Sequence, residues 1–273
     1  MSLILYSKQE ASALAASEKS ESWRHEAEIL KANLILEHSG NIESLLDIGC
    51  GWGQTLRHLV GKIPVLAGAD ESADRLESLK DNELGIQSYQ CKSTELPLGN
   101  DSFDAILMSH VLHEVKLFGN ENDLAKTLSE IKRVLKTDGS FIIIDHRDPE
   151  EGNVSIDPGD QLDNLFKFQE RFKLKKIRFE RNNNLVVMSV RDCHEFVTKI
   201  WSLDSAAEDL EMNETHTVIN QESFATELQA ANFRVKTNLS FNPISKLMAY
   251  YGIKLIDGED WGRQVFLIAS PVS

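Results

Sequence analysis

Two acids and three glycines, gathered in one part of the chain, are the residues best suited to hold a ligand. Asp47 precedes Gly49, Gly51 and Gly53, so the segment reads D-x-G-x-G-x-G. Glycine lets a backbone turn tightly or approach a bound group closely. Asp70 ends the next apolar run, where an acid accepts hydrogen bonds from both hydroxyls of a ribose. This set therefore predicts a binding site for a nucleoside.

The glycine spacing and Asp47 bear on which nucleoside it is. Dinucleotide loops read G-x-G-x-x-G and place a pyrophosphate on a helix N-terminus, whereas here the third glycine comes one residue earlier and Trp52 fills the gap. The Asp47 carboxylate would repel a pyrophosphate by about 1 kcal/mol at 4 Å even in bulk water. It would favour a positively charged ligand, and S-adenosylmethionine (SAM) carries a sulfonium and an ammonium. The plainer interpretation is a strand-to-helix turn without a ligand.

Alternating strands and helices must position these residues. Apolar runs bounded by turn signals predict five strands, with amphipathic helices between them. Because the strands are apolar on both faces, we expect a parallel sheet covered on both sides and doubly wound. Two further strands are predicted near the end of the chain. The expected strands are 44–48, 63–70, 86–91, 103–109, 139–146, 233–239 and 263–271.

The alternation stops after Asp145, where a different plan begins. Residues 147–217 predict a mainly helical insertion, a lid over the substrate, between the two parts of a binding domain at 1–146 and 218–273. In the segment "DCHEFVTKIW", Asp192 is the predicted N-cap of a helix and Glu195 its capping-box partner.

Four segments together resemble class I SAM-dependent methyltransferases. They are "LLDIGCGWG", "AGADES", "STELPLGNDSFDAILMSHVLHEV" and "IKRVLKTDGSFIIID", in that order. The resemblance covers roughly residues 20–146 and, more weakly, 217–271. It implies a seven-stranded, mostly parallel sheet of order 3-2-1-4-5-7-6 with the last strand antiparallel. It also implies SAM as cofactor, with S-adenosylhomocysteine as product.

Carried over residue by residue, the resemblance implies a set of cofactor contacts. These are Asp47 near the ammonium, the loop residues Gly49, Cys50, Gly51 and Gly53, Asp70 on the ribose, Glu71, Lys92, Ser93 and Thr94 around the adenine, and Ser109 and His110 beside the methionine part. Lys92 departs from the pattern, since many relatives have an acid there that accepts from the adenine amino group. An ammonium cannot accept a hydrogen bond, so backbone near Lys92 and Ser93, or a shifted register, would read the adenine.

Methyl transfer is an in-line displacement that needs position and sometimes a base. His110 and His113 are the candidate bases, because histidine titrates near neutrality. The plainer interpretations make His110 a cofactor-lining residue, His113 a packed or solvated helix residue, and Glu114 a solvated helix acid. Asp145 and its neighbours form only an incomplete metal pattern, so we expect no metal.

Composition restricts the partners. The net charge of −14 disfavours nucleic acid, no apolar stretch is long enough to span a membrane, and the start lacks the features of a signal peptide. We therefore expect a cytoplasmic enzyme with a small-molecule substrate. Two alternatives stay open: an RNA or protein methyltransferase that uses the basic segment 171–181, and a non-catalytic SAM-binding regulator. The sequence leaves the acceptor atom and the oligomeric state open.

Overall fold

The computed structural model describes residues 18–80 and 84–272, and the expectation about a signal peptide concerns residues outside that range. The chain divides into two compact units. Unit 1 takes the described residues of Met1–Asp145, Glu222–Leu239 and Phe266–Ser273, and unit 2 takes His146–Gln221 and Ser240–Val265. The segment Ser240–Val265 belongs to unit 2, whereas the predicted division places it in the binding domain.

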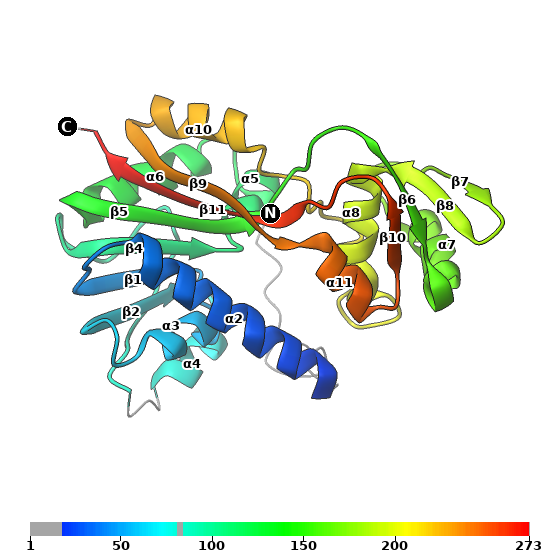
Figure 1. Cartoon of the computed structure of the whole chain (residues 1–273). Coiled ribbons are helices and arrows are strands. Elements are labelled where there is room, and N and C mark those ends of the chain that lie inside the picture. Colours follow the sequence, from blue (N-terminus) through cyan, green and yellow to red (C-terminus); the bar gives the residue numbers. More distant parts are fainter. Residues whose placement is uncertain (1–17, 81–83, 273) are drawn as a thin grey trace. The chain divides into compact units, whose positions relative to one another are not determined.

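Unit 1 is built on a seven-stranded sheet (Figure 1) of order β3-β2-β1-β4-β5-β11-β9. The predicted order 3-2-1-4-5-7-6 is confirmed, and the last strands are antiparallel. The strands are β1 (Ser44–Ile48), β2 (Val65–Asp70), β3 (Gln87–Gln90), β4 (Phe103–Ser109), β5 (Leu135–His146), β9 (Phe233–Pro243) and β11 (Gly262–Pro271).

Strand β1 lies inside the sheet, between β2 and β4, and every residue of "SLLDI" is buried. It pairs in parallel with β2 on one side and β4 on the other, so that Asp47 lies opposite Gly68 and Leu107. From β1 the chain first adds β2 and β3 on one side of the sheet, and then adds β4 and β5 on the other side. Such a switch point opens a crevice at the carboxyl ends of the strands, where α/β proteins bind ligands.

Helices cover both faces of this sheet (Figure 1), with α2, α3 and α4 on one side and α5, α6 and α10 on the other. Helix α6 shows the reason: Leu128, Ile131 and Val134 recur at helical spacing and are buried. None of the helices in the described residues has the long apolar stretch that crossing a membrane requires. The helices are α2 (Glu18–His38), α3 (Gln54–Leu59), α4 (Ala73–Lys80), α5 (Leu112–Phe118), α6 (Asp123–Val134) and α10 (Gln221–Ala230).

Unit 2 contains a four-stranded sheet of order β10-β6-β8-β7, which the mainly helical prediction missed. Its strands are β6 (Asn153–Asp157), β7 (Phe179–Asn182), β8 (Leu185–Ser189) and β10 (Lys254–Asp257). Strand β6 pairs antiparallel with β10 and β8, and β8 pairs antiparallel with β7. These strands are short, and β7 ("FERN") has no buried residue. The period-two pattern that would mark a strand is therefore absent from the sequence there.

The helices of unit 2 include α8, which carries several buried polar residues. Its N-cap is Ser189, whose hydroxyl accepts from the Asp192 N–H, so the predicted cap at Asp192 is wrong by three residues. The helical segments are η1 (Gly159–Gln161), α7 (Leu162–Arg171), α8 (Val190–Lys199), η2 (Ile200–Ser202), α9 (Glu208–Glu211) and α11 (Ile244–Tyr250).

Candidate functional site

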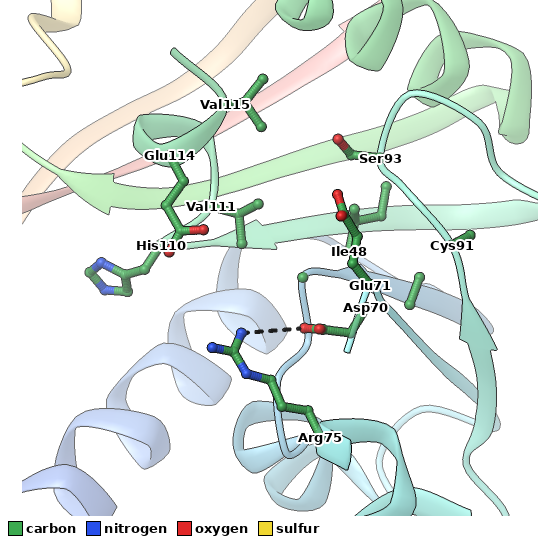
Figure 2. A pocket seen from close by; sticks show the side chains of 12 residues that line it. Ile48, Asp70, Glu71, Arg75, Cys91, Ser93, His110, Val111, Glu114 and Val115 are labelled. Carbon is green, nitrogen blue, oxygen red and sulfur yellow. Dashed lines mark ion pairs between the residues drawn. The ribbon is translucent and has the colours of Figure 1, made fainter. Parts of the chain in front are cut away.

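A pocket opens in unit 1 at the carboxyl ends of β1, β2 and β4 (Figure 2). It has about 590 Å³ of space between its walls, including the part open to solvent. The lining residues are Ile48, Gly49, Ala69, Asp70, Glu71, Arg75, Cys91, Ser93, His110, Val111, Glu114 and Val115. Figure 2 shows His110 and Glu114 on one side, with Asp70, Cys91 and Ser93 on the other.

The glycine loop reaches this pocket through Gly49. Its backbone is left-handed (φ +73°), and its N–H donates to the Ala69 carbonyl at 2.7 Å. A Cβ placed on Gly49 would lie 2.3 Å from Cγ2 of Val111, another residue of the pocket wall. Both the conformation and the close approach therefore require glycine.

Asp70 connects the glycine loop to the end of β2. Its Oδ2 accepts from the Gly51 N–H and its Oδ1 from the Ser72 N–H, each at 2.9 Å. The Arg75 guanidinium lies 3.9 Å from Oδ2. A carboxylate offers about four acceptor positions, so two remain for the ribose hydroxyls that the sequence assigns to it.

Asp47 provides the test of whether a cationic cofactor fits. Its side chain is buried, and its Oδ1 has no hydrogen-bond partner among the described residues. Burial raises the pKa of this carboxyl well above its usual value, and the nearby carboxylates of Glu28 and Asp70 add to the rise, while Lys31 opposes it. A buried carboxylate oxygen without a donor suits a ligand that brings an ammonium, so the residues present fit SAM.

We expect Asp47→Asn to make the ligand-free protein more stable at neutral pH. Because the folded pKa of Asp47 is raised, the native state binds this proton more tightly than the unfolded chain. The free energy of unfolding therefore falls as the pH rises from the pKa of Asp47 in the unfolded chain toward its raised pKa in the folded protein. Removing the charge should recover about 1–3 kcal/mol above that window, the cost of an unsatisfied buried polar group. Urea unfolding at several pH values measures it.

Asp138→Asn is the matched control, since Asp138 is an exposed residue of unit 1. It should leave the pH dependence of the unfolding free energy unchanged. The Asp47 variant should match the wild type at acid pH and exceed it at neutral pH. A wild-type pH dependence in the Asp47 variant would contradict the assignment of this cost to Asp47.

The pocket wall includes five of the predicted cofactor contacts and omits the others. Included are Gly49, Asp70, Glu71, Ser93 and His110. Outside the wall are Asp47, Cys50, Gly51, Gly53, Lys92, Thr94 and Ser109.

The residues after β3 alternate in direction. Cys91 and Ser93 line the pocket, while Lys92 is exposed and forms a bridge with Glu95. Extended backbone sends successive side chains to opposite sides, so the side chains of Cys91 and Ser93, and not that of Lys92, border the pocket.

The loop residue Cys50 packs into unit 1 instead of facing the pocket. It is buried, and its Sγ lies 2.6 Å from the position of a Cβ on Gly68. Burial raises the pKa of its thiol far above the usual range. Cys50 therefore fills space between the loop and β2.

His113, a predicted base, does not line the pocket. Its ring is buried, with Nδ1 2.6 Å from Oδ1 of Asp145, and its backbone N–H donates to Oδ2 of the same carboxylate at 3.0 Å. These two contacts tie the start of α5 to β5. Asp145 is thus occupied within the core of unit 1.

Glu114 lines the pocket, although the sequence suggests a solvated helix acid at this position. It is half-buried in the wall beside His110. Burial raises its pKa, and the nearby charges of His113 and Arg75 oppose that rise. The helix pattern of "VLHEV" gave no signal of this position. The other lining residues not predicted are Ile48, Ala69, Arg75, Cys91, Val111 and Val115.

Known proteins resemble the same part of the chain. Residues 46–143 match a family described as a methyltransferase domain. An uncharacterized methyltransferase, YcgJ of Bacillus subtilis, is 31% identical over 112 residues, which cover 39% of this chain and 42% of that protein. The mitochondrial arginine-hydroxylase NDUFAF5 of Danio rerio is 30% identical over 133 residues, 48% of this chain and 40% of that protein. The chain thus matches less than half the length of these relatives.

A solved structure shares the fold. The 1,6-didemethyltoxoflavin-N1-methyltransferase of Burkholderia thailandensis, determined with bound 1,6-didemethyltoxoflavin and S-adenosylhomocysteine, aligns with a TM-score of 0.52 at 16% identity, over all of this chain and 94% of the other. The pocket lies at the end of the matched segment's strands. Residues 46–143 are thus similar to a methyltransferase domain, and the sheet order agrees with the fold of the solved methyltransferase structure.

Proposed function

We propose that the protein transfers a methyl group from SAM to a small-molecule acceptor. One observation supports this most: a single pocket holds Asp70, suited to a ribose, and, on its other side, two proton-accepting side chains, His110 and Glu114. When bound, SAM supplies the electrophilic methyl carbon. Asp70 and the Gly49 backbone would fix the cofactor, and His110 or Glu114 would take the proton that the acceptor loses.

The raised pKa of Glu114 suits such a role. Burial is its largest cause, and a carboxylate whose pKa lies nearer the working pH is a stronger base. His110 stands beside it with a left-handed backbone (φ +56°), a conformation that costs energy for residues other than glycine. Strain of this kind often accompanies a functional position.

The basic segment 171–181 gives little support to RNA as the substrate. Arg171 contacts Asp204 and Glu208, both at 2.8 Å. Two lysines of the same segment are also paired with acids. The lysine pairs are Lys173 with Asp209 at 2.6 Å and Lys175 with Asp192 at 2.9 Å. Cations already paired with carboxylates attract phosphates less strongly, and the chain is acidic overall.

Labelled SAM offers the test. The full chain is incubated with methyl-labelled SAM and, in separate reactions, with small metabolites, RNA and protein from a cell extract. We expect label in the small-metabolite fraction. Glu114→Gln should lower the rate by about 10²- to 10⁴-fold, the usual contribution of a general base, without weakening S-adenosylhomocysteine binding. The pKa of Glu114 is raised above 4.5. As the pH is lowered, the wild-type rate should therefore begin to fall while the pH is still above 4.5.

Glu121→Gln is the control, because Glu121 is an exposed acid of the same region. Label in RNA that is lost when Lys175, Lys176 and Arg178 are neutralised would replace this proposal with RNA methylation. Cofactor binding with no labelled product in any fraction would favour a non-catalytic SAM-binding protein, or the different chemistry that the name of the Danio rerio relative indicates.

A further inference from the structure

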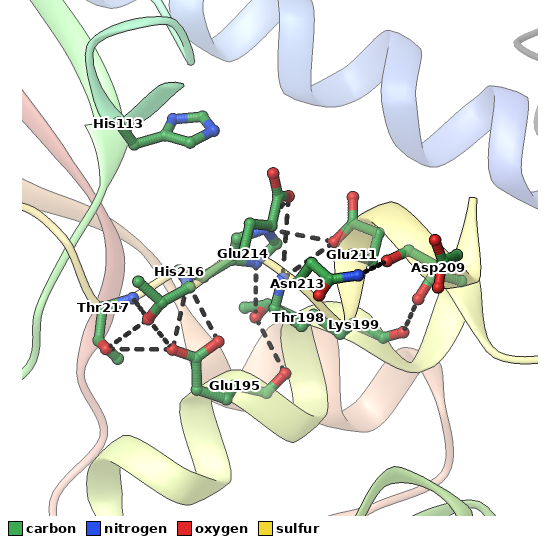
Figure 3. Close-up of polar contacts among 12 residues, drawn as sticks. His113, Glu195, Thr198, Lys199, Asp209, Glu211, Asn213, Glu214, His216 and Thr217 are labelled. Carbon is green, nitrogen blue, oxygen red and sulfur yellow. Dashed lines mark hydrogen bonds and ion pairs between the residues drawn. The ribbon is translucent and has the colours of Figure 1, made fainter. Parts of the chain in front are cut away.

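Unit 2 contains a buried group of two carboxylates and one imidazole (Figure 3). Glu211 ends α9, and Glu214 and His216 follow it, so the segment reads E-x-x-E-x-H. The exposed fractions are only 7%, 5% and 4%, respectively. One potential ligand atom from each of the three residues lies within 4.8 Å of the other two. Three such groups in the interior require a counter-charge.

The distances in this group exceed those of ion-paired hydrogen bonds. Nε2 of His216 lies 3.4 Å from Oε2 of Glu211 and 3.3 Å from Oε1 of Glu214. A charged N–H that donates to a carboxylate lies about 2.7–2.9 Å from it. Ligands that surround a tetrahedral zinc ion at about 2.0–2.1 Å are separated by roughly 3.3–3.4 Å. The two distances from Nε2 therefore fit those between neighbouring ligands of such an ion.

The outer hydrogen bond of His216 directs the correct nitrogen into the group. The Thr198 hydroxyl donates to the His194 carbonyl at 2.7 Å. Since its single hydrogen is used there, this hydroxyl accepts from Nδ1–H of His216 at 2.9 Å. In the neutral imidazole, the lone pair of Nε2 then faces the two carboxylates, with Oε1 of Glu214 at 3.3 Å. An acceptor turned toward two acceptors is unfavourable unless a cation lies between them, and this arrangement is usual for a metal-bound histidine.

Helix α8 fixes the segment in place. The buried Glu195 carboxylate accepts from the His216 backbone N–H at 3.0 Å and from the Thr217 hydroxyl at 3.0 Å. The His216 ring stacks on His146, with centroids 3.7 Å apart and planes 7° from parallel. The position and plane of the imidazole are thus determined before any ion binds, which preorganises the site.

Lys199 partly balances the charge of the group. Its buried ammonium lies 3.1 Å from Oε2 of Glu211 and 3.8 Å from Oε1 of Glu214. Two carboxylates and one ammonium leave one negative charge, to which a neutral His216 adds nothing. A divalent ion with a bound hydroxide would bring the total to zero. Lys199 would then act as the outer partner that ligating carboxylates usually have.

We propose that Glu211, Glu214 and His216 bind a divalent transition-metal ion of the zinc class. Nitrogen and carboxylate ligands suit Zn²⁺ and its neighbours in the first transition row. Three protein ligands leave a fourth position for water. The sequence expectation of no metal considered only the residues around Asp145, because E-x-x-E-x-H is not the spacing of a familiar zinc motif. This proposal is independent of the methyl-transfer proposal.

The test titrates Co²⁺ into the full chain after chelator treatment, because Co²⁺ replaces zinc and gives visible absorption bands in tetrahedral sites. We expect uptake of about one equivalent with intense bands of that kind, and competition by Zn²⁺. Glu214→Gln and His216→Gln should each weaken Co²⁺ binding by about 100-fold or more, the upper limit for losing an outer-sphere partner. Far-ultraviolet circular dichroism checks that both variants are folded.

Glu170→Gln is the control, since Glu170 is an exposed glutamate of unit 2, and it should bind Co²⁺ as the wild type does. No Co²⁺ uptake by the wild-type chain would overturn the proposal. So would equal uptake by the wild type and both ligand variants, or a protonated His216 ring that persists in excess Co²⁺. In the last case, Lys199 and an imidazolium would be the counter-charges.

Discussion

Gly49→Ala is expected to destabilise the protein by about 2–5 kcal/mol and to abolish cofactor binding. A left-handed backbone costs a residue with a Cβ about 1–2 kcal/mol, and Gly49 has φ +73°. The added methyl would lie 2.3 Å from Cγ2 of Val111, and overpacking of this kind costs about 1–3 kcal/mol. Both residues line the pocket. Whichever of them shifts to relieve the clash, the shape of the pocket changes, and cofactor binding should suffer. Urea unfolding and calorimetric titration with S-adenosylhomocysteine measure the two effects.

Two further variants separate strain from clash. Gly61→Ala introduces the same strain at φ +74° with nothing within 4 Å, and should cost only the backbone part. The double variant Gly49→Ala with Val111→Ala removes the neighbouring methyl groups and should recover part of the stability. If Gly49→Ala were no worse than Gly61→Ala, the close approach of the loop to Val111 would not matter.

Asp70→Asn should weaken S-adenosylhomocysteine binding by roughly 10- to 150-fold. Hydrogen bonds to a charged group are worth about 1.5–3 kcal/mol, which is a factor of that size in affinity. The amide also turns an N–H₂ toward the N–H of either Gly51 or Ser72, both of which now donate to this carboxylate. Loop geometry and ribose contact would suffer together. Calorimetric titration gives the change in dissociation constant.

Glu71→Gln is the matched comparison for Asp70. It removes the same charge from the same pocket, whereas the hydrogen bond to the Gly51 N–H is accepted by Asp70. A smaller loss for Glu71 would assign the effect to direct hydrogen bonding, whereas equal losses would assign it to the general field of the pocket. Unchanged affinity in Asp70→Asn, or tight NAD binding by the wild type, would contradict the assigned cofactor role.

The fold of unit 1 could be predicted because its signals are local and repeated. Buried parallel strands read as apolar runs, as "SLLDI" does, and the glycines and Asp70 mark where such strands end. The pocket follows from the sheet order, since the carboxyl ends of neighbouring strands meet at one edge. What the pattern could not give is which side chains turn inward. For example, Cys91 lines the pocket and Lys92 does not, and a shift of one residue in register would reverse this.

Unit 2 was harder to predict because its contacts are distant and its strand β7 is polar. Strand β7 has no buried residue, and the segment 240–265 joins residues from 146–221 only in three dimensions. Glu195 illustrates the same limit: its position suggests a cap, but its carboxylate accepts from the His216 backbone. Glu114 likewise reads as a surface acid, and only the fold shows that it borders the pocket.

The pairing of β10 with β6 has a consequence for the order in which the protein is made. Lys254 pairs with Asp157 and Leu255 with Ile156, and β7, β8 and β9 all lie between them in the sequence. At about 5–20 residues per second, a ribosome needs roughly 5–20 seconds to deliver β10 after β6 has emerged. Throughout that time one edge of β6 lacks its partner strand. A nascent or truncated chain that ends before β10 therefore presents an open strand edge with which another chain can pair.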